Sequence, residues 1–326
     1  MLLSRSGGII KSVSPRFASI PRPSIRSMAT VRSSLPHEDR TAAEPRESRL
    51  EPVVLSNIRQ VNENIRLLRL NAADPNHTIK VIKFLPGQWL DTFIPGLPKA
   101  GGFTITSTPS EARPSSHLSP FLELAVQKSS NPPAQWLSRP EEEILGQKLV
   151  VRVGGSFTWP PPKLDAGSID RLVLIAGGVG INPLISIFSH LIRTGQHPKE
   201  IHFIYGTKAT PELDRHSILF LTRLMDLVGI ANDPNITLSL YLTGTGDDGA
   251  IDHGNFPNRT FARRITELDL ARALDGFKEN LYGAEHDRQG TVCYVCGPQK
   301  MTDEFVDFLS AQPGMARDRV LCEKWW

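Results

Sequence analysis

Short apolar runs separated by turn-forming residues characterise the first half of the chain. Six runs have strand character, and clusters of Pro, Gly, Asn and Ser separate them: 53–55, 65–70, 89–94, 103–106, 121–126 and 148–153. Many short strands with frequent turn signals are typical of an antiparallel barrel. We therefore expect a six-stranded antiparallel β-barrel domain over residues 50–165.

The pattern changes near residue 166, where apolar runs begin to alternate with longer helical segments. The expected strands cover residues 171–176, 201–205, 236–242, 291–296 and 319–322. The expected helices lie near residues 183–194, 216–228, 266–280 and 300–311. Such alternation predicts a parallel sheet with helices on both faces. We expect residues 166–326 to form an α/β domain with a five-stranded parallel sheet.

The first helix of this second region has clear end signals. Asn182 can cap it, Pro183 suits its first position, and Gly195 can end it. Residues 243–263 are predicted to be a long loop on the carboxyl side of the third strand. Ligands bind at that edge in sheets of this kind, so the loop lies near any nucleotide site.

Basic residues are concentrated at the amino end. The first 37 residues hold six basic residues and many serines, and no acidic residue occurs before Glu38. Such a leader is typical of a mitochondrial matrix presequence, the alternative being a disordered basic tail. Residues 38–50 are polar and aperiodic, so we expect residues 1–49 to be a presequence and linker. Met28 offers a second start, which would give a cytosolic form.

The remaining composition excludes several classes of protein. Without the six leader residues, 31 basic residues face 34 acidic ones, so the charge balance gives no support for nucleic-acid binding. No run approaches the roughly 18 consecutive apolar residues of a membrane span, and we expect no transmembrane segment. The sequence does not indicate the oligomeric state.

The three cysteines do not form a recognisable metal or redox motif. Cys293 and Cys296 are spaced C-x-x-C within a predicted strand, where residues three apart point to opposite faces. Cys322 is the only other cysteine, so an internal zinc or iron–sulfur site is not expected. Any second redox centre must belong to another molecule.

Two turns are suited to a nucleotide. Gly178 and Gly180 lie between a strand and a helix, where backbone N–H groups and the helix dipole can face a pyrophosphate. A plain tight turn is the alternative. The fourth strand is followed by a similar arrangement of Cys296, Gly297, Pro298 and Met301.

The end of the second expected strand bears on the choice of dinucleotide. No acidic residue that could bind ribose hydroxyls occurs before Glu212, whereas Lys208 and Arg215 can pair with a 2′-phosphate. Both cations are also ordinary loop charges. The choice between NADH and NADPH therefore stays open.

Five motifs in a fixed order connect the chain to a known family. They cover residues 84–89, 101–107, 177–183, 296–301 and 323–326. In this order they resemble the ferredoxin-NADP reductase superfamily over residues 50–326. Residues 264–266 and the ending at 323–326 are most similar to the mitochondrial oxidoreductase NAD-binding domain-containing protein group.

The resemblance implies FAD on the barrel and NADH or NADPH on the parallel sheet, with hydride passing from nicotinamide to flavin. The matching flavin-strand residues are Phe103, Thr104, Ile105 and Thr106. The family arginine that pairs with flavin phosphate is replaced by Gly101, and a family serine by Ala134. Loss of such a charge-assisted contact would weaken flavin binding by about 1.5–3 kcal/mol.

The same resemblance assigns the nicotinamide side. Cys296 would lie against the nicotinamide ring, and Glu323 would stabilise charge or relay a proton. Trp325 or Trp326 would stack on the flavin, and the spacing from Glu323 favours Trp325. The alternatives are an inert buried thiol, a solvated carboxylate and core indoles. With Gly178, Gly180, Asn182, Pro183 and Lys208, these residues complete the expected site.

The function expected from these residues is that of a flavin-dependent NAD(P)H oxidoreductase that passes electrons to an unidentified acceptor. Gly101 and Ala134 favour the alternative, a non-catalytic nucleotide-binding or assembly protein on the same fold. A third interpretation is an electron-transfer subunit that needs its partner.

Overall fold

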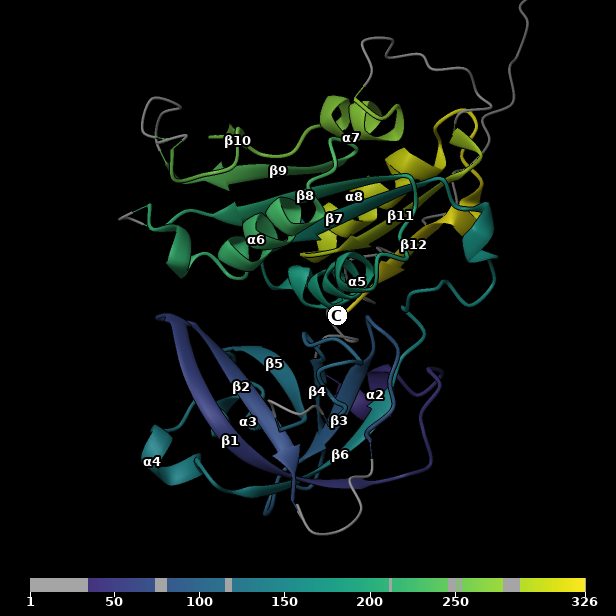
Figure 1. The fold of residues 1–326 in the computed structure, drawn as a ribbon. Helices are drawn as coiled ribbons and strands as arrows, with labels where there is room; N and C mark the ends of the chain where they lie inside the picture. Colours follow the sequence, from purple (N-terminus) through teal and green to yellow (C-terminus); the bar gives the residue numbers. More distant parts are fainter. Residues whose placement is uncertain are drawn as a thin grey trace, which may run out of the picture.

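A computed structural model describes residues 35–73, 81–114, 119–210, 213–245, 251, 254–277 and 288–325. It consists of a β-barrel and an α/β region stacked on one another (Figure 1). The predicted leader up to residue 34, with Met28, lies outside the described residues, as do Glu212 and Trp326.

The barrel consists of six antiparallel strands. They are β1 (Glu51–Asn62), β2 (Ile65–Ala72), β3 (Trp89–Phe93), β4 (Gly101–Thr104), β5 (Phe121–Gln127) and β6 (Lys148–Gly154), in the order β4-β3-β6-β1-β2-β5. A bridge between Ile105 and Leu124 links the two outer strands. The prediction of six antiparallel strands is confirmed. Strand β1 is longer than the run expected at residues 53–55, because its second half is polar and gives no apolar pattern. Its pairing with β2 is irregular in register at two points.

The second sheet is parallel and has six strands. They are β7 (Arg171–Gly177), β8 (Glu200–Lys208), β9 (Ile236–Thr243), β10 (Arg259–Phe261), β11 (Thr291–Cys296) and β12 (Val320–Glu323), in the order β10-β9-β8-β7-β11-β12. The five expected strands are present. The sixth, β10, lies within the predicted loop 243–263, and its three residues are too few to show a period.

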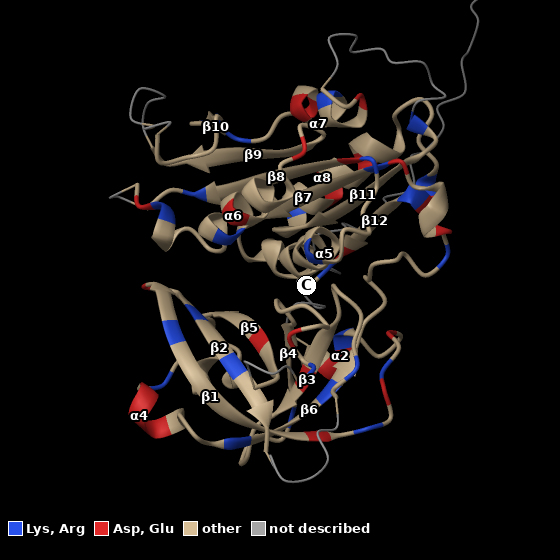
Figure 2. Ribbon diagram, viewed as in Figure 1, with Lys and Arg blue, Asp and Glu red and all other residues tan. Residues whose placement is uncertain are grey.

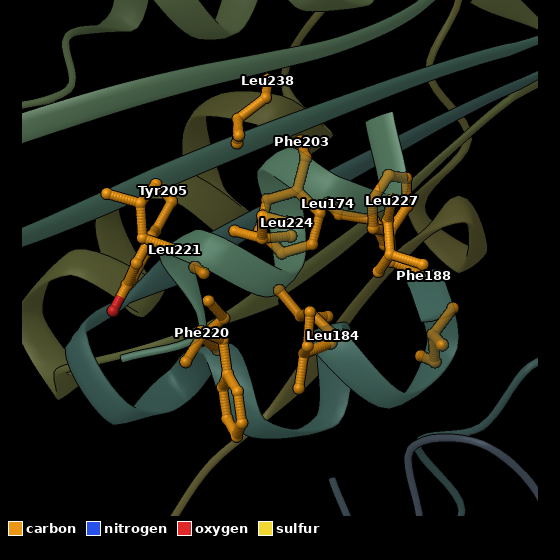
Figure 3. Packing of buried hydrophobic residues seen from close by; sticks show 14 of the residues in the cluster. Leu174, Leu184, Phe188, Phe203, Tyr205, Phe220, Leu221, Leu224, Leu227 and Leu238 are labelled. Carbon is orange, nitrogen blue, oxygen red and sulfur yellow. The ribbon is translucent and has the colours of Figure 1, made fainter. Parts of the chain in front are cut away.

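Helices cover both faces of this sheet. They are α5 (Ile181–Thr194), α6 (Leu221–Ala231), α7 (Glu267–Leu274) and α8 (Gln299–Ser310). Three short helices, α2 (His37–Arg40), α3 (Pro132–Trp136) and α4 (Glu141–Ile144), lie in the barrel region instead (Figure 1). Helices α5 and α6 lie on the face toward the barrel (Figure 1). Their core is shown in Figure 3, where Phe188 of α5 packs edge-on against Phe203 of β8 at 5.4 Å between ring centroids.

The ends of α5 test the capping prediction. Gly195 ends the helix in the left-handed region at φ 66°, as expected. Asn182 does not cap it, because a 3₁₀ turn over Gly178–Gly180 runs directly into the helix. Its side-chain amide instead donates to the Ala125 carbonyl of β5 at 3.0 Å. Asn182 therefore links the α/β region to the barrel. Pro183 is the third residue of the helix, two positions later than expected.

The segment before β1 is folded onto the barrel, in contrast to the linker expected at residues 38–50. Helix α2 packs beside β4, and His37 is only 3% exposed. Arg46 forms an antiparallel bridge with Gly154 of β6. No helix within the described residues combines the length and apolar character needed to cross a membrane.

Candidate functional site

The two glycine-containing turns of the parallel sheet pack directly against one another. A Cβ atom added to Gly180 would lie 2.3 Å from the Cys296 carbonyl oxygen, and one added to Gly177 would lie 2.7 Å from Met301 Sδ. Side chains at these positions would therefore push the turns apart. Gly178, by contrast, has nothing within 4 Å of its Cβ position, so open space remains over the amino end of α5, which fits a dinucleotide pyrophosphate.

The second turn contains Cys296, Gly297 and Pro298. A Cβ on Gly297 would lie 2.3 Å from Met301 Cε, so Met301 closes over this turn. Cys296 is fully buried, and burial raises the pKa of its thiol well above the usual range, with the Glu323 charge acting in the same direction. The thiol is therefore neutral near pH 7 and can shape a pocket but is a poor nucleophile.

Glu323 lies beside Cys296, because the two residues are register partners on β12 and β11. The residue is partly exposed, but its Oε2 is buried and has no hydrogen-bond partner among the described residues. Burial, followed by the charge of Glu44, raises the pKa of this carboxyl well above its usual range. This environment therefore favours the protonated carboxyl over the carboxylate.

Trp325 covers these two groups. Hydrogen bonding by its side chain lowers the pKa of both Cys296 and Glu323, against the dominant effect of burial. Its ring stacks on His37, with centroids 5.7 Å apart and planes 21° apart, and its carbonyl accepts a hydrogen bond from Arg40. The described indole therefore also contacts the amino-terminal segment.

The expected flavin strand is packed tightly against the barrel interior. Phe103 belongs to the barrel core, and a Cβ on Gly101 would lie 2.6 Å from the Phe103 ring. Ile105 is also core, Thr104 is buried, and Thr106 donates its hydroxyl to the Glu123 carboxylate at 3.0 Å. The space over Gly101 is filled by Pro133 and Phe103, so an arginine at this position would require these side chains to move.

The remaining expected residues lie at the carboxyl edge of the sheet. Lys208 is exposed at the end of β8, and Arg215 is partly exposed in a 3₁₀ turn. Asn182 Oδ1 is buried without a hydrogen-bond partner among the described residues. Lys208 is free to meet a solvated phosphate, and Asn182 offers an acceptor between the two regions.

Sequence reasoning missed the amino-terminal contribution to this site. His37 lies at the end of the segment interpreted as a leader, and Arg40 and Glu44 lie in the segment interpreted as a linker. The residues that they contact or influence electrostatically are about 280 positions later. One local signal was available. Asp91 is a charged residue in the middle of an otherwise apolar strand, and such a residue needs a buried partner.

Comparison with known proteins agrees with this architecture. The ferric reductase NAD binding domain matches residues 169–309. The chain is 32% identical over 304 residues to oxidoreductase NAD-binding domain-containing protein 1 of Danio rerio, covering 91% of this chain and 100% of that relative. The chain belongs to this family. The Xenopus tropicalis member is 33% identical over 310 residues, covering 92% of this chain and 87% of that protein.

More distant relatives support the fold. The reductase component of propane 2-monooxygenase from Rhodococcus jostii is 26% identical over 278 residues, covering 83% of this chain and 62% of that protein. A solved ferredoxin NADP+ reductase from Neisseria gonorrhoeae with bound FAD and NADP aligns with TM-score 0.60 at 14% identity, covering 86% of this chain and 100% of that one. The chain therefore has the two-part fold of NAD(P)H-dependent reductases.

Proposed function

We propose that the protein is a flavin-dependent NAD(P)H oxidoreductase that takes hydride from NADH or NADPH and passes electrons through FAD to an acceptor of unknown identity. The observation that carries the proposal is the open space over Gly178 at the amino end of α5, next to the packed turns Gly177–Gly180 and Cys296–Gly297. Glu323 of β12 is the register partner of Cys296 beside this space. FAD, when bound, would accept the hydride and release electrons singly.

Each residue has a separate task in this proposal. Gly178 lets the backbone approach the pyrophosphate, and Gly180 lets the two turns pack closely beneath it. Cys296 provides a neutral wall for the nicotinamide, and Glu323 holds a proton beside it. Trp325 excludes water from both groups until a ring displaces it. Pro298, Met301 and Lys208 would line the dinucleotide, whereas Phe103 to Thr106 would line the flavin.

Binding titrations test the two cofactors separately. NADH and NADPH should each be added to the full chain with and without FAD, and flavin retention followed by visible absorbance after gel filtration. The proposal expects dinucleotide binding in both samples and retained flavin in the second. A chain that binds neither dinucleotide overturns it.

The packing of Phe103 over Gly101 favours a second candidate, a nucleotide-binding protein that has lost tight flavin binding. The space that a phosphate-pairing arginine would need is filled by the aromatic ring. This candidate predicts dinucleotide binding with no retained FAD. The same titrations therefore separate the two functions.

We also propose that the leader directs the protein to mitochondria, on the basis of its acid-free, Arg- and Ser-rich composition. Fusion of residues 1–37 to a fluorescent protein should give mitochondrial fluorescence, and the chain started at Met28 should remain cytosolic. Cytosolic fluorescence of both would contradict this.

A further inference from the structure

The amino-terminal segment 35–46, called the strap below, is anchored in the barrel wall by His37. The imidazole lies edge-on to Trp89, with centroids 4.6 Å apart, and His37 Nε2 is 3.1 Å from the Asp91 carboxylate. A Cβ on Gly102 would lie 2.1 Å from the imidazole. The absence of a side chain at position 102 is therefore what allows His37 to lie on β4.

The other end of the strap is held by the same carboxylate. Arg46 Nε is 2.9 Å and Arg152 Nη2 is 2.7 Å from Asp91 Oδ2, and Asp91 is fully buried. Arg46 also donates to the Thr41 carbonyl at 2.6 Å, which fixes the turn within the strap. Basic and acidic residues lie together around α2, β3 and β6 (Figure 2). The strap is therefore a fixed part of the barrel.

From this anchor the strap reaches the carboxyl end of the chain. Arg40 donates to the Trp325 carbonyl, and His37 stacks on the Trp325 ring. Glu44, held by the Ser156 hydroxyl at 2.6 Å, contributes to the raised pKa of Glu323. These contacts join the two ends of the chain across the two regions of the fold.

We propose that His37 and Arg40 are positioning residues for the nicotinamide side, because they hold Trp325 over Cys296 and Glu323. This inference rests on the proposed function. A chain end frays unless something holds it, and these two contacts hold the last described residue. A nicotinamide ring that approaches Cys296 must displace Trp325. Each contact between the strap and Trp325 therefore opposes dinucleotide binding by as much as it stabilises the state in which Trp325 covers Cys296.

The test uses full-length chains carrying His37→Ala or Arg40→Gln, with Arg40→Lys as the conservative variant. Lys99→Ala is the matched control, because its ion pair with Asp39 is exposed and 3.9 Å long. Hydrogen exchange of the peptide covering 320–325 is measured without ligand, and NADH and NADPH are then titrated. Barrel peptides in the same exchange experiment report whether a variant is folded, since Arg46 and Arg152 still pair with Asp91.

We expect exchange at 320–325 to be about tenfold faster in His37→Ala and Arg40→Gln, and the dinucleotide dissociation constant to fall by a similar factor. Arg40→Lys should recover part of both effects, and Lys99→Ala should match the wild type. Unchanged exchange at 320–325 would overturn the positioning role. Faster exchange with unchanged dinucleotide affinity would also overturn it, since the strap would then be structural only.

The proposed function fails by a different result. If no variant binds NADH or NADPH, yet exchange at 320–325 rises in His37→Ala and Arg40→Gln, the strap contacts are supported and the dinucleotide site is not.

Discussion

On the sheet side of the candidate site, the walls are two turns, each next in sequence to the strand and the helix that it joins. On the barrel side, the walls come from both ends of the chain. Gly180 and Gly297 pack through backbone and neighbouring side chains. His37 and Trp325, by contrast, are 288 positions apart in the sequence and stack on one another. A local sequence motif therefore specifies the wall on the sheet side, and long-range packing specifies the wall on the barrel side.

The two sides also differ in their electrostatics. On the sheet side, Cys296 is fully buried and Glu323 is partly exposed with a buried Oε2, and burial raises the pKa of both side chains well above their usual ranges. On the barrel side, burial acts to raise the pKa of Asp91, but hydrogen bonds from His37, Arg46 and Arg152 outweigh it and lower the pKa to about 2. Interactions between charged groups therefore stabilise the barrel side of the site, and the exclusion of water stabilises the sheet side.

The largest expected effect is on the charged side. Asp91→Asn leaves Arg46 and Arg152 facing a neutral amide, which should cost about 3 kcal/mol of unfolding free energy. Urea denaturation measures it. Asp170→Asn is the control, because the pair that Asp170 forms with Lys199 is exposed, and its loss should leave stability nearly unchanged. Equal effects of the two substitutions would contradict the anchoring role of Asp91.

The next effect tests the packed turns. Gly180→Ala introduces a Cβ 2.3 Å from the Cys296 carbonyl, so we expect a loss of about 2 kcal/mol and weaker dinucleotide binding. Gly229→Ala in α6 is the control, since nothing lies within 4 Å of its Cβ position. That substitution should be neutral or stabilising by about 0.5 kcal/mol. If both alanines are tolerated equally, the turns are not in the close contact described.

Acidification should weaken the barrel side selectively. The pKa of Asp91 is lowered in the folded state, so its stabilisation is present above the unfolded pKa of about 3.9 and is lost as pH falls toward about 2. The stability difference between wild type and Asp91→Asn should therefore shrink by about 1 kcal/mol from about pH 5 to about pH 3. A difference that stays constant would show that Asp91 carries no charge-dependent stabilisation.

The smallest effect concerns thiol reactivity on the sheet side. Cys293 and Cys296 are buried, and burial raises the pKa of each, whereas Cys322 is partly exposed. Iodoacetamide near neutral pH should therefore label Cys322 first, as followed by peptide mass spectrometry. Preferential labelling of Cys296 would indicate a reactive thiol and contradict the neutral wall assigned to it.

The two sides account for what could be predicted from the sequence. The strand, glycine turn and helix around Gly180 are contiguous, and the sheet and most helix positions follow from periodicity. The three-residue β10 gives no period, and Asn182 resembles a cap although its amide reaches Ala125. No local pattern predicts the roles of His37 and Gly102, because these roles depend on a contact between chain segments that only folding brings together.

The central claim, that this chain transfers hydride from a nicotinamide dinucleotide to a flavin, is tested most directly by stopped-flow absorbance. The full-length protein is reconstituted with FAD and mixed with NADH or NADPH in the absence of oxygen. The account predicts bleaching of the bound flavin by at least one dinucleotide, and slower bleaching in Gly180→Ala. Bound flavin that neither dinucleotide bleaches would contradict the claim.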